Sequence, residues 1–237
     1  MQLKTSLLFL AGLVPFGLAL PHAIEQRDQY VSHGFGGRSK AAVGANVDLY
    51  KGNVGNPWGS NIIEISADKA DKYKYVVEVS GKNKKPWNVV FWNKYGPSGK
   101  LDGHYGNSAL SFSLGPGETK HIAFDENSQV SMGAAPSDLP KGNYGGYSCT
   151  WGEFDFGNTS NNGCSGFDVS AIQAMLSGHD VQGMKICDES SGVCSAVSTG
   201  GKVVDNAYTD GEIDIGGIGG NLQAGAVRLS VVIDYDG

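Results

Sequence analysis

The stretch CTWGEFDFG, residues 149–157, alternates polar and apolar side chains in the manner of a β-strand with one buried face. Two phenylalanines share one side of this strand, and the other side carries Trp151, Glu153 and Asp155. We expect the phenylalanines to enter a hydrophobic core. The tryptophan and the two carboxyl groups then mark the face on which a function has to be sought.

The same alternation recurs through most of the chain. It is found in residues 61–66, 73–81, 87–96, 109–124 and 227–236. The second and third of these runs are joined by GKNKKP, and a Gly-Pro-Gly turn interrupts the fourth, so we expect two β-hairpins. Only residues 168–176 have helical character, and this segment is short.

These patterns predict an all-β protein, since no strand alternates with a long helix. We expect an antiparallel β-sandwich of about eight to eleven strands, with short helical turns and glycine-rich loops. The 36 glycines among 237 residues are about twice the usual share, which is typical of a chain with many turns. Residues 34–237 are expected to form one domain, preceded by a flexible extension over 20–33.

The N-terminus is typical of a secretory signal peptide over residues 1–19. Lys4 precedes an almost wholly apolar run from Leu7 to Leu20, and Gly17-Leu18-Ala19 offers a small-x-small cleavage site. This run is too short for a stable membrane span, and no later segment could cross a bilayer. The sequence therefore predicts a secreted, extracellular protein that is not embedded in a membrane.

The formal net charge of −6 argues against nucleic acid or an anionic membrane surface as a partner, because both require a basic patch. We also expect no metal and no cofactor. There is no C-x-x-C motif with histidines at ligand spacing, and the glycines of 216–225 do not follow a dinucleotide-binding pattern.

The four cysteines are Cys149, Cys164, Cys187 and Cys194. An oxidising compartment favours disulfides, and four cysteines allow three pairings. We favour Cys187–Cys194, because CDESSGVC has the form of a tight hairpin with Gly192 at its turn. A Cys149–Cys164 bond then follows by elimination.

The polar face of 149–157 has three interpretations. Side chains two apart on a strand lie about 6.5–7 Å from one another, so Glu153 and Asp155 are within the range of about 5–9.5 Å that glycosidases use. Asp168 could join them, and Trp151 could stack on a sugar ring. The face is therefore a solvated side of a sheet, a carbohydrate-binding surface or a catalytic acid/base pair. Asn158 begins an N-glycosylation sequon, which predicts an exposed loop there.

Several long strings resemble the secreted fungal allergens typified by Asp f four. They are YKGNVGNPWGSNIIEIS (50–66), VVFWNKYGPSG (89–99), ETKHIAFDENSQ (118–129), GGYSCTWGEFDFG (145–157), SGFDVSAIQ (165–173) and VQGMKIC (181–187). The resemblance runs from about Gly34 to the C-terminus. It implies secretion and binding by host IgE, and it implies no established enzymatic activity.

A second resemblance is shorter. WGEFDF followed by GFDVSAI is similar to the thaumatin-like signature, in which acids line a cleft between sheets and are linked with β-1,3-glucan binding. Glu153 and Asp168 match this pattern by position, whereas Gln173 stands where a further acid is expected. The resemblance implies a thaumatin-like sandwich.

Together these observations predict an extracellular or cell-wall-associated binding protein with a β-glucan site formed by Trp151, Glu153, Asp155 and Asp168. The first alternative is a weak endo-β-1,3-glucanase that uses Glu153 with Asp155 or Asp168. The second is a host-interaction protein without a small ligand.

Overall fold

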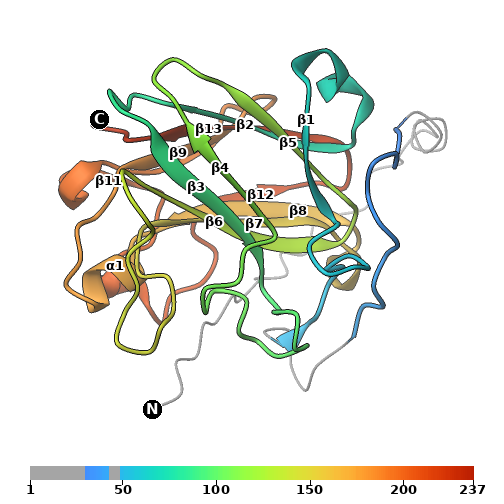
Figure 1. Cartoon of the computed structure of the whole chain (residues 1–237), viewed down its shortest axis with the longest axis horizontal. Coiled ribbons are helices and arrows are strands. Elements are labelled where there is room, and N and C mark those ends of the chain that lie inside the picture. The colour runs from blue at the N-terminus through green and yellow to red at the C-terminus, as the bar shows by residue number, and fades with distance from the viewer. Residues whose placement is uncertain (1–29, 43–48) are drawn as a thin grey trace, which may run out of the picture.

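Two β-sheets packed face to face make up the protein (Figure 1). The computed structural model describes residues 30–42 and 49–237. Within them, the seven-stranded sheet has the strand order β1-β5-β2-β13-β9-β10-β11, and the six-stranded sheet has the order β12-β8-β7-β6-β3-β4. The prediction of an all-β fold in two sheets is confirmed.

The bounds of the elements are as follows. The seven-stranded sheet contains β1 (Ile62–Ile65), β2 (Tyr75–Gly81), β5 (Lys120–Phe124), β9 (Met184–Asp188), β10 (Cys194–Val197), β11 (Val204–Asp205) and β13 (Val227–Ile233). The six-stranded sheet contains β3 (Trp87–Asn93), β4 (Leu110–Leu114), β6 (Ser128–Ala135), β7 (Trp151–Asn158), β8 (Cys164–Ser170) and β12 (Gly220–Leu222). The helical turns are η2 (Ala67–Lys72), η3 (Thr159–Asn161), α1 (Ile172–Leu176), η4 (Thr199–Gly201) and η5 (Asp210–Glu212).

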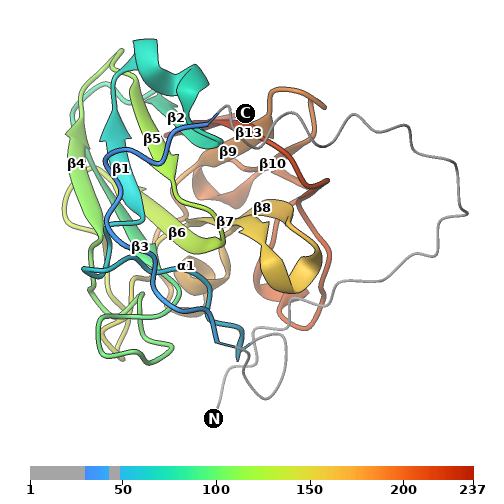
Figure 2. The same ribbon diagram turned by 90° about the vertical axis from the view of Figure 1, so that its right-hand side faces the viewer.

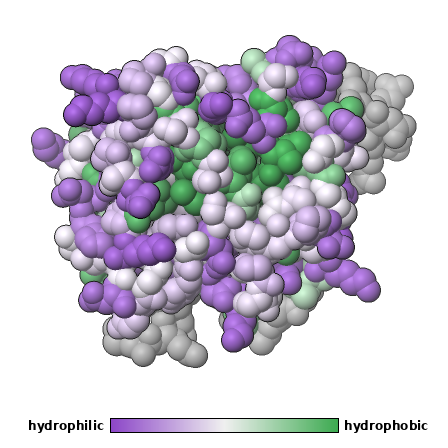
Figure 3. All heavy atoms as spheres, in the orientation of Figure 1, coloured by the Kyte–Doolittle hydropathy of each residue, from purple (hydrophilic) through white to green (hydrophobic). Residues whose placement is uncertain are grey.

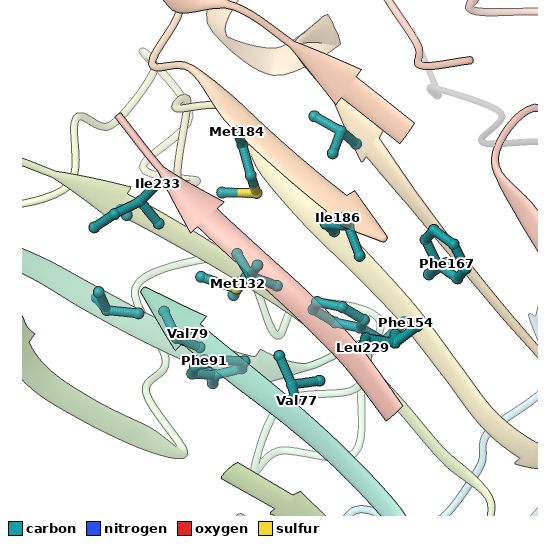
Figure 4. Packing of buried hydrophobic residues seen from close by; sticks show 14 of the residues in the cluster. Val77, Val79, Phe91, Met132, Phe154, Phe167, Met184, Ile186, Leu229 and Ile233 are labelled. Atoms are coloured by element: carbon teal, nitrogen blue, oxygen red, sulfur yellow. The ribbon is translucent and has the colours of Figure 1, made fainter. Parts of the chain in front are cut away.

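The hydrophobic core lies between the two sheets. Figure 4 shows side chains that meet there, among them Val77, Ile186 and Leu229 from the seven-stranded sheet and Phe91, Met132 and Phe154 from the six-stranded sheet. Burial of each such side chain contributes about 1.5–3 kcal/mol. Alternation along each strand therefore selects which face turns inward, as the sequence predicted for β2, β7 and β13.

One side of the sandwich leaves part of this core uncovered. The edge strands β1 and β4 lie on that side (Figure 2), and Figure 3 shows apolar residues gathered over the middle of the corresponding face. Leu110 and Phe112 of β4 are only partly buried, although they pack against the core. Edge strands have a neighbour on one side alone, which accounts for this exposure.

Both predicted hairpins are wrong. β2 and β3 belong to different sheets, and so do β4 and β5, so each connection carries the chain across the sandwich. The buried side chain of Asn83 helps to hold the first crossing, because its Nδ2 donates to the carbonyl groups of Lys85 and Leu114 at 2.8 and 2.9 Å. An inward-facing alternation is the same for a hairpin and for a crossing between sheets, so the pattern could not distinguish them.

Three further details of the fold differ from expectation. The sheets are not wholly antiparallel, since β13 runs parallel to β2 with Leu229 opposite Val77. The described residues also contain thirteen strands, more than predicted, because the count includes the short strands β11 and β12. The helical segment expected over 168–176 begins only at Ile172, and Asp168 lies on a strand.

The cysteines are correctly predicted for one pair and wrongly for the other. Cys187 and Cys194 are bonded across the β9–β10 hairpin, whose turn contains Gly192. Cys149 and Cys164 are both free. Cys149 precedes β7, whereas Cys164 lies opposite Asn158 at the far end of this eight-residue strand. The strand separates them by about 20 Å or more, far beyond the roughly 7 Å that a disulfide can bridge.

The predicted signal peptide, residues 1–19, and most of the predicted extension lie outside the described residues. The first described residues are held by hydrogen bonds to the body of the fold. The Val31 N–H donates to the Lys72 carbonyl at 2.9 Å, and Tyr73 Oη donates to the His33 carbonyl at 2.7 Å. Arg38 binds Asp125 with Nη2 at 2.6 Å from Oδ1. In the part of the chain that is described, no helix is long and apolar enough to cross a membrane.

The state of the cysteines can be checked by thiol titration without reductant. We expect one reactive thiol per native chain, from half-buried Cys164, and two after denaturation. Cys149 should not react in the native chain, because burial excludes the reagent and raises the pKa of its thiol to about 12. Denatured chains without free thiol would show that Cys149 and Cys164 are bonded.

Candidate functional site

The three central strands β6, β7 and β8 carry the candidate site on their outer face. Phe154 and Phe156 of β7 point into the core, where they are 4% and 0% exposed. Trp151, Glu153 and Asp155 therefore occupy the opposite side of the sheet, as the alternation predicted. The core contacts of the phenylalanines thus determine on which side the acids lie.

Strand register brings the fourth predicted residue to the same place. Asp168 on β8 is the direct partner of Glu153 in the antiparallel pair, and Asp155 is opposite Gly166, two residues away. The Cβ atoms of directly paired residues lie about 4.5–5.5 Å apart. Glu153 and Asp168 are therefore direct cross-strand neighbours, and Asp155 lies diagonally across from Asp168.

These acids are largely withdrawn from water. Asp155 and Asp168 are 8% and 6% exposed, and Glu153 is half-buried. Asp155 Oδ2 accepts a hydrogen bond from Asn158 Nδ2 at 2.6 Å. Among the described residues, nothing donates to Asp168 Oδ1, although this atom is buried. A buried carboxyl oxygen without a donor is costly, which favours the protonated form of Asp168.

Burial and mutual repulsion change the acidity of the pair. Burial raises the pKa of Asp168 well above its usual range, and the adjacent Glu153 carboxylate raises it further. Burial also raises the pKa of Glu153, against the attraction of Lys94 and a hydrogen bond from Ser131. Like charges this close resist joint ionisation, so the pairing of Glu153 with Asp168 favours the protonated form of one of the two carboxyl groups.

Asp155 is the third acid of the site. Burial raises its pKa to about 6, although hydrogen bonds from Asn158 and Gln129 and the charge of Lys94 oppose the shift. Gln129 lies directly opposite Asp155 on β6. This carboxyl group therefore also holds its proton into the weakly acidic range.

Trp151 is held at one end of the acids by neighbouring aromatic rings. Its Nε1 donates to the Tyr147 carbonyl at 3.1 Å. Its ring lies 5.4 Å from that of Trp92 in an edge-on arrangement and 5.3 Å from the imidazole of His104. The half-buried indole is thus fixed in orientation, with part of its surface still accessible.

The glycine-rich segment 216–225 packs against the acids and was not predicted to contribute to the site. It contains β12, which pairs with β8. Gly219 approaches Asp168 so closely that a Cβ on Gly219 would lie 2.7 Å from the Cβ of Asp168, and its φ is +105°. Only glycine fits such a position without strain. The cluster of glycines was a signal for close backbone approach, but it did not identify Asp168 as the neighbour.

Asn158 is not in an exposed loop, so that expectation is wrong. Its side chain is 5% exposed, its Nδ2 donates to Asp155, and its Oδ1 accepts from Ser160 N at 2.8 Å. A glycan on Nδ2 would be incompatible with this packing. The asparagine instead orients one acid of the site.

No group of three or more His, Cys, Asp and Glu side chains suited to a metal ion occurs within residues 30–42 and 49–237.

The positive charge of Lys94, a residue that the sequence analysis did not single out, attracts both Glu153 and Asp155. Lys94 directly follows β3, and its N–H donates to the carbonyl of Gln129, the β6 partner of Asp155.

The fold and the site define a β-sandwich with a buried acidic group and an aromatic cluster on the outer face of one sheet. A family model described as the Allergen Asp f 4-like domain matches residues 60–233. The chain belongs to this family, as its sequence motifs predicted.

Two individual proteins are similar to the chain. Allergen Asp f 4 of Aspergillus fumigatus is 55% identical over 208 residues, which cover 87% of this chain and 64% of that protein. The chain thus spans about two thirds of the length of this relative. Among solved structures, the protein elicitor MoHrip2 from Magnaporthe oryzae aligns with a TM-score of 0.42 at 11% identity, covering 68% of this chain and 99% of that one.

The pKa shifts predict how Asp168→Asn alters stability. A carboxyl group whose pKa is higher in the folded than in the unfolded chain stabilises the fold less as pH rises between the two values. The wild type should therefore lose stability relative to Asp168→Asn as pH rises from the acid range, where Asp168 is protonated in both states, into the range where only the unfolded chain ionises it.

Urea denaturation at several pH values measures this change. Asp210→Asn, on the exposed turn η5, serves as the control and should follow the wild type at every pH. A stability difference between Asp168→Asn and the wild type that does not vary with pH would contradict the raised pKa of Asp168.

Proposed function

We propose that the protein is a secreted, cell-wall-associated binding protein that holds a segment of β-glucan at Glu153, Asp155 and Asp168 beside Trp151, without cleaving it. The observation that carries this proposal is the direct pairing of Glu153 with Asp168 on the face that also bears Trp151. The N-terminal signal and the Cys187–Cys194 disulfide support export, because disulfides persist in oxidising compartments.

The chemistry of a sugar suits this arrangement. Sugar hydroxyl groups donate hydrogen bonds, and carboxyl oxygens accept them, so the half-buried Glu153 is the acid that a sugar hydroxyl can reach most readily. The accessible part of the Trp151 indole offers an apolar surface for the C–H groups of a ring. Binding sites for small ligands combine such apolar surfaces with a few oriented polar groups. The thaumatin-like resemblance of the motif around Glu153 and Asp168 supports the same ligand class.

Sedimentation with insoluble β-1,3-glucan tests the proposal. The double variant Glu153→Gln/Asp168→Asn should be retained at least about tenfold less than the wild type, since hydrogen bonds to charged groups contribute about 1.5–3 kcal/mol. The matched control, Glu64→Gln/Asp236→Asn, makes the same substitutions at the surface elsewhere and should be retained as the wild type. Equal retention of all three proteins would show that Glu153 and Asp168 do not contribute to glucan binding.

The second candidate function is that of an endo-β-1,3-glucanase. The observation that favours it is the pair of acids with raised pKa values, because a glycosidase needs one carboxyl group protonated and one ionised. Asp168, whose pKa is raised well above its usual range, would be the acid, and Glu153 the nucleophile or base. Release of reducing ends during the same incubation would identify the enzyme. A protein that neither binds nor cleaves glucan would fit a host-interaction role without a small ligand.

We also propose that the protein is an IgE-binding allergen, which its 55% identity to Allergen Asp f 4 supports. Protein recovered from culture medium should compete for IgE in sera that recognise that allergen. Substantial competition is expected because more than half of the aligned positions are identical over 87% of the chain. Absence of competition by the native protein would contradict this proposal, and unfolded protein serves as the control for conformational epitopes.

A further inference from the structure

An aromatic row continues the candidate site away from the acids. The imidazole of His104 lies 5.3 Å from the ring of Trp151 and 4.2 Å from the ring of Tyr105. Trp151 is two residues from Glu153 on the same strand face, a spacing of about 6.5–7 Å. Neighbouring groups are therefore adjacent along one row, which runs from the acids through the indole and the imidazole to the phenol ring.

Exposure increases along this row. Trp151 and His104 are half-buried, and Tyr105 is 48% exposed. An exposed aromatic ring packed on one side against another ring keeps its remaining surface available for a ligand. The row therefore leads from buried polar groups to an accessible apolar surface.

Two loops fix the row in place. The Tyr147 N–H donates to the His104 carbonyl at 2.9 Å, which ties the loop before β7 to the loop between β3 and β4. Gly146 approaches the imidazole so closely that a Cβ there would lie 2.8 Å from His104 Cδ2. Asn107 Nδ2 donates to the Asp102 carbonyl at 2.9 Å and closes the turn that presents His104 and Tyr105. Preorganised rings lose little conformational entropy when they bind.

We propose that Trp151, His104 and Tyr105 form a second subsite, which stacks on a neighbouring ring of the same glucan chain that occupies the acids. This inference rests on the proposed function and specifies its ligand: a linear oligosaccharide longer than a single ring, rather than a terminal sugar. Stacking on aromatic faces suits a neutral polysaccharide, because it needs no charge on the ligand. Burial also lowers the pKa of His104, against the attraction of Asp102, which favours the neutral imidazole.

Calorimetric titration with β-1,3-linked oligosaccharides, from the disaccharide to the hexasaccharide, tests the subsite. The wild type should bind more tightly as the ligand lengthens. Tyr105→Ala should weaken binding of the hexasaccharide by about three- to tenfold, the effect of losing one aromatic contact, and leave the disaccharide unaffected. Because Tyr105 is exposed, its removal should not disturb folding.

Tyr235→Ala is the matched control, since Tyr235 follows β13 on the other sheet, and its affinities should equal those of the wild type. Tyr105→Ala binding all lengths as tightly as the wild type would overturn the subsite and leave the acidic site standing. So would an equal loss at every length. A wild type that binds no oligosaccharide of any length would overturn both the subsite and the proposed function.

Discussion

The burial of Phe154 and Phe156 between the two sheets is the constraint on which the candidate site depends. Side chains on a strand alternate between two faces. Because these rings lie in the core, Glu153 and Asp155 must lie on the outer face. The antiparallel register with β8 then brings Asp168 opposite Glu153. A shift of one residue in this strand would move the phenylalanines to the outer face and the acids into the hydrophobic core, and the core contacts of both rings oppose it.

The buried acidic group destabilises the fold, so its presence indicates a function. Two neighbouring carboxyl groups are held out of water, one of them with an oxygen that lacks a donor, and glycine at 219 lets the backbone close over them. An apolar pair would stabilise the same sheet without this cost. Natural proteins depart from consistent local chemistry mainly where function requires it. The aromatic row beside the acids is preorganised by loop contacts rather than by the core, so the two parts of the site have separate structural supports.

Much of the architecture could be predicted from alternation alone. The strands, the buried faces of β2, β7 and β13, and the Cys187–Cys194 hairpin follow from local patterns, and the family follows from long sequence matches. The pairing of strands could not be predicted in the same way. Crossings between sheets and hairpins within one sheet have the same pattern, so β2–β3 and β4–β5 were assigned wrongly. The Cys149–Cys164 pairing failed for a related reason, since elimination takes no account of a strand that holds the two cysteines apart.

For the site, the sequence by itself determined that Trp151, Glu153 and Asp155 share one face, because side chains on a strand alternate with a period of two. It also indicated Asp168 through a resemblance. Only the tertiary structure decided that Asp168 is the direct partner of Glu153, that Asn158 is buried against Asp155, and that Lys94, His104 and Tyr105 lie near the same face. These relations depend on register and loop packing between segments distant in the chain. Burial and the pKa shifts that follow from it arise only when those segments meet.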